Sequence, residues 1–254
     1  TYCDLLEQKR IALGDEINVV VPTGNFGNIL AAYYAKNMGL PIKKLICASN
    51  SNNVLTDFLK TGEYDKNRKF FTTTSPSMDI LISSNLERLL YHMSGEDDTL
   101  VNELMNALST DGKYKVSKTL IDSIQTVFDA GCCDEASVDA TIKEHFDKYH
   151  YLCDTHTAVA VEVYDDYVKR TGDDIPTVID STASPYKVSK SDLTAVTGGE
   201  EANLDEFAMV DELNKISGVD VPKPLQALKD KAVRFNNVCD KENMSEMVFK
   251  LLNL

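Results

Sequence analysis

The sequence V-V-V-P-T-G-N-F-G-N, from Val19 to Asn28, is the most informative part of this chain. A run of β-branched residues ends at Pro22, a Gly/Asn turn follows, and an apolar-periodic segment begins at Ile29. This order predicts a buried strand, a tight turn and a helix. A second buried strand is expected at Leu45–Ala48, and strand, helix and strand within about thirty residues predict a parallel crossover.

The Gly/Asn turn favours a phosphate site at the start of the predicted helix. Gly24 and Gly27 allow the backbone to approach a ligand where a Cβ atom would obstruct it. Unpaired amide groups and the positive end of the helix dipole together attract an anion such as phosphate. The spacing alone leaves a second interpretation open, in which Asn25 simply caps the helix.

The composition limits the classes of function. The 254 residues carry a formal net charge of −14, which argues against nucleic-acid binding, because nucleic-acid phosphates require a basic surface. A phosphate site in such a chain has to work locally, through oriented amides. The six cysteines and four histidines show no metal-binding spacing, so we expect no metal and reduced cytoplasmic thiols. No apolar run of membrane-spanning length and no signal peptide are recognised.

The rest of the pattern predicts an α/β chain. Further strands are expected at Phe70–Thr74 and Thr177–Asp180, each beside helical segments. Two amphipathic helices, 118–129 and 134–149, are expected on either side of a turn at Gly131. We predict a parallel-sheet, three-layer domain over 1–190 and a mainly helical tail over 191–254, in which Glu200-Glu201 forms a solvated loop.

Five motifs, in order along the chain, resemble those of threonine synthase, a pyridoxal-phosphate enzyme of the tryptophan-synthase-β-like group (fold type II). The first lies between Asn18 and Ser51, above all in V-P-T-G-N-F-G-N. The others are S-P-S-M-D-I, S-S-N-L-E-R, D-T-H-T-A-V-A and S-T-A-S-P-Y-K, which cover Ser75–Ile80, Ser83–Arg88, Asp154–Ala160 and Ser181–Lys187. The resemblance extends from about residue 16 to residue 190.

The resemblance implies a lyase of threonine biosynthesis that converts O-phosphohomoserine and water to threonine and phosphate. Enzymes of this family hold pyridoxal 5′-phosphate as a Schiff base on a lysine in an N-terminal G-P-T-x-x-F-K-D type motif. This chain contains no such motif. We therefore expect it to correspond to the C-terminal part of the enzyme, to need the N-terminal half as a partner, and to be inactive alone.

The resemblance also assigns the cofactor-binding residues. The phosphate seat would be formed by Gly24, Asn25, Phe26, Gly27 and Asn28, with Phe26 packing its side chain and binding through its backbone. Thr182 matches the family position whose hydroxyl meets the pyridine nitrogen. An open alternative is that Ser181 and Thr182 cap a helix that starts near Pro185.

Other candidate residues have weaker support. No catalytic residue is assigned with the lysine absent, apart from His156 as a proton carrier or phosphate donor, and a lone loop histidine is more often structural. The substrate-binding candidates are Ser83, Ser84, Asn85, Arg88 and Asp154. Arg88 suits a carboxylate or phosphate, but it could equally pair with Glu87 or Asp79 on a solvated face.

Two other functions stay open at this stage. The chain could be a non-catalytic domain that binds phosphate compounds or a partner subunit. It could also belong to a related phospholyase that acts on another phosphorylated amino acid.

Overall fold

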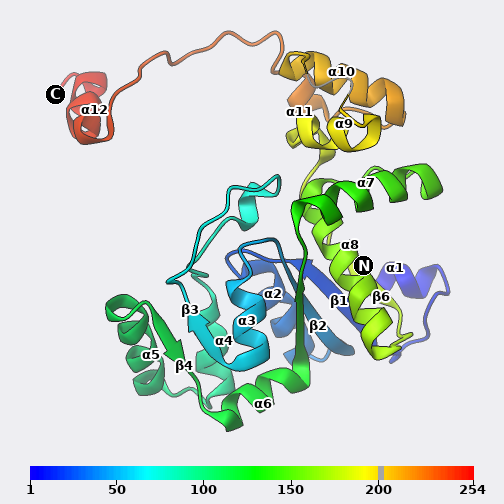
Figure 1. Cartoon of the computed structure of the whole chain (residues 1–254), viewed down its shortest axis with the longest axis vertical. Coiled ribbons are helices and arrows are strands. Elements are labelled where there is room, and N and C mark those ends of the chain that lie inside the picture. The colour runs from blue at the N-terminus through cyan, green and yellow to red at the C-terminus, as the bar shows by residue number, and fades with distance from the viewer. Residues whose placement is uncertain (200–202) are drawn as a thin grey trace. The chain divides into compact units, whose positions relative to one another are not determined.

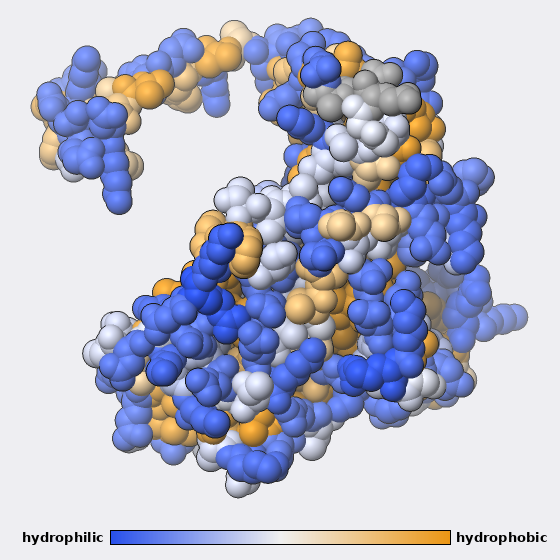
Figure 2. All heavy atoms as spheres, viewed as in Figure 1, coloured by the Kyte–Doolittle hydropathy of each residue, from blue (hydrophilic) through white to orange (hydrophobic). Residues whose placement is uncertain are grey.

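The computed structural model describes residues 1–199 and 203–254, and the predicted solvated loop at Glu200-Glu201 lies outside them. It contains two compact units, Thr1–Val219 and Asp220–Leu254. The predicted boundary at residue 190 falls inside the first unit. In Figure 2, hydrophilic residues cover most of the visible face of the first unit, as a net charge of −14 leads one to expect.

A four-stranded sheet forms the centre of the first unit (Figure 1). Its order is β5-β2-β1-β6, and each neighbouring pair is parallel, which confirms the predicted parallel crossover. The strands are β1 (Ile17–Pro22), β2 (Ile42–Ser49), β5 (Phe128–Cys132) and β6 (Thr177–Ile179). The carboxyl ends of these strands meet at one edge of the sheet, which is where ligands gather in folds of this kind.

Helices cover both faces of this sheet, which gives the predicted three layers. On one face, α2 (Gly27–Asn37), α3 (Val54–Thr61) and α6 (Lys118–Val127) share a core with Val21, Leu45 and Phe128. The strand residues that alternate with these, such as Val20 and Ile46, point to the other face of the sheet and are fully buried outside that core. They face α8 (Thr155–Thr171), which contacts all four strands and buries its segment Ala158–Val161.

The remaining elements surround this centre. The strands β3 (Glu63–Asp65) and β4 (Lys113–Lys115) form a separate antiparallel pair. The remaining α-helices of the first unit are α1 (Tyr2–Glu7), α4 (Leu86–Met93), α5 (Asp98–Thr110), α7 (Glu135–Tyr149), α9 (Ser189–Thr197) and α10 (Glu206–Ser217). Two single 3₁₀ turns occur at Pro76–Met78 and Pro185–Lys187.

Two sequence predictions are wrong. The turn predicted at Gly131 is part of β5, because the helix before it ends when Phe128 adopts extended geometry and the chain then pairs with β2. The strand predicted at Phe70–Thr74 is irregular, because side chains and not a neighbouring strand satisfy its backbone. The amide of Phe71 donates to Asn52 Oδ1, and that of Thr73 donates to Asp79 Oδ2, each over 2.9 Å.

The second unit is helical at its two ends. It contains α11 (Lys223–Gln226), a 3₁₀ turn (Lys241–Asn243) and α12 (Met244–Leu252), with an irregular segment between α11 and the 3₁₀ turn. Several apolar side chains of α12 are more than half exposed, namely Met244, Val248, Phe249, Leu251 and Leu252. Among the described residues of the chain, no helix is both long and apolar enough to cross a lipid bilayer.

Candidate functional site

The loop between β1 and α2 has a row of free amide groups. Before it, the Thr23 amide donates to Ala48 O (2.8 Å), and after it, the Leu30 amide donates to Phe26 O (3.1 Å). Between these bonds, the amides from Gly24 to Ile29 donate to no atom of residues 1–199 or 203–254. The N-cap of α2 is Phe26 without a side-chain hydrogen bond, so the alternative in which Asn25 caps the helix is not realised.

Phe26 sets the direction of this loop. Its φ of 63° lies in the left-handed region, which costs a non-glycine residue about 1–3 kcal/mol. The side chain is buried, as predicted, and its ring centroid lies 5.8 Å from that of Phe128. Burial of an aromatic ring offsets the backbone strain, because such a side chain contributes on the order of 2–3 kcal/mol. The strained turn is therefore held by the core below it.

Two residues hold the loop from its outer side. Ser83 Oγ donates to Gly24 O over 2.9 Å. The Nδ2 group and the backbone amide of Asn85 donate to Asn25 O over 2.7 and 3.2 Å. Arg88 in turn donates to Asn85 Oδ1. Because these bonds fix the loop carbonyls on one side, the amide groups of the same peptide units turn to the other side.

A cavity of about 270 Å³ lies beside this loop. It is lined by Pro22, Thr23, Gly24, Asn25, Phe26, Gly27, Asn28, Ser77, Met78, His156, Thr182 and Ala183. The structure thus brings together the whole predicted phosphate seat, Thr182 and His156. The predicted substrate residues Ser83, Ser84, Asn85, Arg88 and Asp154 do not line the cavity, and neither does any lysine or arginine.

Ser77 and Met78 form the wall opposite Gly24, and the sequence analysis gave them no role. A Cβ atom on Gly24 would lie 2.6 Å from Ser77 O, whereas one on Gly27 would meet only Asn85 Nδ2, at 3.7 Å. Gly24 is therefore needed for the close approach of Ser77, whereas no neighbouring atom of the described residues requires a glycine at position 27. The signal for this wall was the motif S-P-S-M-D-I, which contains both residues.

His156 is an oriented, buried member of the site. The Ser77 amide donates to its Nε2 (3.3 Å), so its proton lies on Nδ1 and is donated to Asp154 Oδ1 (2.9 Å). Asp154 also caps α8 through the amides of His156 and Thr157. Burial raises the pKa of Asp154, but the hydrogen bonds from His156 and Thr157 outweigh it and leave the pKa below its ordinary value.

Thr182 also lines the cavity and lies just beyond β6. It is exposed, and its hydroxyl has no hydrogen bond to any described residue. The 3₁₀ turn at Pro185 starts after Ser184 without a side-chain cap, so neither Ser181 nor Thr182 caps it. The neighbouring Ser181 Oγ accepts from Thr157 Oγ1 over 3.1 Å, which links this segment to α8.

Comparison with known proteins identifies the relatives of this chain. No family model matches the sequence. It is 46% identical to human threonine synthase-like 1 over 196 residues, which are 77% of this chain and 26% of that protein. It is 38% identical to threonine synthase of Saccharomyces cerevisiae over 216 residues, which are 80% of this chain and 42% of that protein. The chain is homologous to the C-terminal part of threonine synthases.

Solved structures of threonine synthases share this fold. The yeast enzyme superposes with a TM-score of 0.79 at 32% identity, over 98% of this chain and 50% of that one. The pyridoxal-phosphate-bound threonine synthase of Brucella melitensis gives 0.71 at 36% identity, over 86% of this chain and 45% of that one. The fold is therefore that of the fold type II enzymes, as predicted. The chain spans at most about half the length of these threonine synthases.

Proposed function

We propose that this chain is the cofactor-binding C-terminal portion of a pyridoxal-phosphate-dependent threonine synthase, which converts O-phosphohomoserine and water to threonine and phosphate. The row of free amides from Gly24 to Ile29, beside a cavity that also contains Thr182, carries the proposal. The homology to threonine synthases supports it independently.

The loop fits the phosphate group of this cofactor. A phosphate ester carries between about 1.5 and 2 negative charges near neutral pH and needs several donors. The amides from Gly24 to Asn28 supply donors at the positive end of α2. No cationic side chain lines the cavity, so the oriented amides would bind the phosphate without the help of a lysine or arginine.

The other residues of the cavity have distinct tasks. When bound, the cofactor supplies an electron sink for carbanion chemistry at the substrate. The Thr182 hydroxyl would contact the pyridine nitrogen, and unlike a carboxylate it cannot hold that nitrogen protonated. His156 would hold the Ser77 segment against the loop, since its Nε2 accepts from the Ser77 amide. A proton-transfer role for His156 would require that contact to break.

Ser84 and Arg88 stay proposed contacts for a substrate phosphate or carboxylate. Both side chains are exposed, and Arg88 donates a hydrogen bond to Asn85, one of the two residues that hold the Gly24 loop. Ser83 and Asn85 would act mainly through the loop that they hold, and Asp154 through His156. We place the protein in the cytoplasm, consistent with six free cysteines in the structure.

The phosphate-binding step can be tested without the catalytic lysine. Pyridoxine 5′-phosphate, which lacks the reactive aldehyde, should bind the 254-residue chain in equilibrium dialysis, and pyridoxine without phosphate should not. Gly24→Ala should weaken binding about ten-fold or more, because a Cβ atom 2.6 Å from Ser77 O displaces the loop. Asn37→Ala, at the exposed end of α2 away from the loop, is the control and should leave binding unchanged.

A second variant distinguishes weaker binding from a loss of folding, which Gly24→Ala alone does not. Asn85→Ala removes a side-chain donor to Asn25 O and leaves the glycines intact, so it should weaken binding while the melting temperature stays close to that of the parent. Equal affinity for pyridoxine and its phosphate ester, or unchanged affinity in both Gly24→Ala and Asn85→Ala, would refute the phosphate seat.

A further inference from the structure

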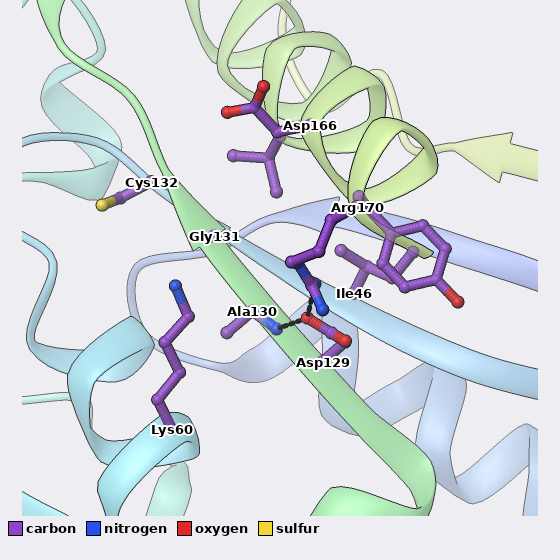
Figure 3. Close-up of a pocket in the computed structure, with 10 residues that line it drawn as sticks. Ile46, Lys60, Asp129, Ala130, Gly131, Cys132, Asp166 and Arg170 are labelled. Carbon is purple, nitrogen blue, oxygen red and sulfur yellow. Dashed lines mark hydrogen bonds and ion pairs between the residues drawn. The ribbon is translucent and has the colours of Figure 1, made fainter. Parts of the chain in front are cut away.

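A second cavity, of about 360 Å³, lies at the outer edge of β5 (Figure 3). It is lined by Ile46, Lys60, Asp129, Ala130, Gly131, Cys132, Val163, Asp166, Tyr167 and Arg170. No residue lines both this cavity and the one beside the Gly24 loop. The edge cavity is therefore a separate site.

The edge cavity extends over both faces of the strand. On the face of α3, Cys132 Sγ lies 3.8 Å from Asn53 Nδ2, and Lys60 projects from the end of that helix. On the face of α8, a Cβ on Gly131 would lie 2.8 Å from Val163 Cγ1, and Arg170 lies nearby. The backbone edge of β5 thus forms the middle of the cavity.

Only part of that backbone edge is free. The Cys133 amide donates to Ser49 O of β2, so by alternation the polar groups of Ala130 and Cys132 point away from β2. The Ala130 amide is already taken by Asp129 Oδ1 at 2.7 Å. This leaves the carbonyls of Ala130 and Cys132 as acceptors and the Cys132 amide as a donor, and none of the three has a partner among the described residues.

The charges around the cavity are unevenly paired. Arg170 forms an ion pair with Asp129 (2.7 Å), and Asp166 forms a looser, exposed pair with Lys169 (3.6 Å). Lys60 forms no ion pair with any residue in the described ranges. The buried side chains of Ile46, Val163 and Tyr167 give the cavity an apolar wall on the α8 side. A ligand that fits has a carboxylate, a hydrogen-bond donor and an apolar group.

We propose that the edge cavity binds a free α-amino acid with an aliphatic side chain. The carboxylate is held by Lys60 and the Cys132 amide, and the ammonium group by the Ala130 carbonyl and Asp166. The side chain lies against Val163 and Tyr167. An added β-strand fits less well, because Asp129 occupies the Ala130 amide, and its ion pair with Arg170 closes the edge at that point.

The exposed thiol of Cys132 provides a direct test. L-Leucine at saturating concentration should slow the alkylation of Cys132 by N-ethylmaleimide several-fold, because a bound molecule covers the cavity that this thiol lines. Cys3 is also exposed and lies outside the cavity, so its alkylation rate is the internal control. Mass spectrometry with fragmentation of the peptides distinguishes Cys132 from the adjacent Cys133. It gives the alkylation rates of Cys132 and Cys3 from one sample.

Charge contacts are tested by a variant and by two analogues. Lys60→Met should raise the dissociation constant of L-leucine about ten-fold or more, the effect of one lost charge-assisted hydrogen bond. Lys113→Met, at an exposed lysine in β4, should leave it unchanged. 3-Methylbutylamine lacks the carboxylate and 4-methylpentanoate lacks the ammonium group, and both should protect Cys132 poorly.

Unchanged Cys132 reactivity in L-leucine would overturn the proposal. So would protection that persists in Lys60→Met, or equal protection by leucine and both analogues. Loss of protection that is confined to Lys60→Met, with a normal melting curve for that variant, supports it.

Discussion

At the residue scale, the two glycines of the loop illustrate what sequence can and cannot predict. The sequence predicts a glycine-rich turn at a helix start and places both glycines in it. It does not tell Gly24, which lies against Ser77, from Gly27, which has room for a side chain. It also misses the left-handed Phe26, because that conformation depends on a core contact with Phe128 that is distant in sequence.

Asp192 in α9 is a buried carboxyl group that the sequence analysis did not notice. It is fully buried, and neither of its oxygens has a hydrogen-bond partner. Burial, and next the nearby charges of Asp154 and Asp139, raise its pKa to about 9. The folded protein therefore holds a proton that the unfolded chain releases near pH 4, so this group lowers stability as the pH rises from about 4 to about 9.

Asp192→Asn should flatten this dependence. Between pH 4 and pH 8, the free energy of unfolding should fall less in the variant than in the parent, by on the order of 2–4 kcal/mol. Urea denaturation at the two pH values measures the difference. Asp174→Asn, at an exposed carboxylate, is the control and should follow the parent. Parallel curves for the parent and Asp192→Asn would contradict the assignment.

At the element scale, β5 is the main error of the sequence analysis. Its sequence, F-D-A-G-C, has no long β-branched run, and Gly131 next to two cysteines is typical of a turn. The strand exists because its backbone pairs with β2 and because Gly131 allows Val163 of α8 to pack against it. Both causes involve distant residues, so tertiary contacts override the local pattern here.

Gly131→Ala should destabilise the packing of β5 on α8. Its Cβ atom would lie 2.8 Å from Val163 Cγ1, and an overpacked contact of this kind costs about 1–3 kcal/mol. Chemical denaturation measures the loss. Val163→Ala in the same chain removes the opposing methyl groups, so the double variant should be more stable than the sum of the single effects predicts. Strict additivity would show that the contact is not the cause.

At the scale of the whole molecule, the class of fold and the position of the loop after β1 could be predicted, whereas the contacts that support this loop could not. The alternation of strands and helices fixes a parallel sheet, and the loop after β1 has to lie at its carboxyl edge. The contacts that hold this loop come from Ser83 and Asn85, in the irregular segment between the 3₁₀ turn at Pro76–Met78 and α4. The course of such a segment follows side-chain bonds that no periodic pattern predicts.

In the proposed function, this chain binds the cofactor and an N-terminal half carries the catalytic lysine. The chain alone is therefore expected to be inactive. Alone, with pyridoxal 5′-phosphate and O-phosphohomoserine, it should release no phosphate above the buffer rate, because no G-P-T-x-x-F-K-D lysine is present. Addition of a separately produced N-terminal half that carries this motif should restore threonine formation. The measurement is phosphate release together with threonine detection.

Two outcomes would alter this interpretation. Threonine formation by the 254-residue chain alone would show that another lysine serves the reaction. Failure of two folded halves to produce threonine, with intact binding of pyridoxine 5′-phosphate, would favour the non-catalytic binding domain.

The shortness of β6 has a consequence for the assembly of the site. This edge strand has three half-buried residues, pairs on one side with β1, and carries Thr182 just beyond its end. Its other side has no strand partner among the described residues. A polypeptide segment that pairs there would stiffen the arm that presents the Thr182 hydroxyl. Binding of the pyridine ring would then depend on whether a second polypeptide pairs with β6. The chain would retain the cofactor more tightly in the complex than alone.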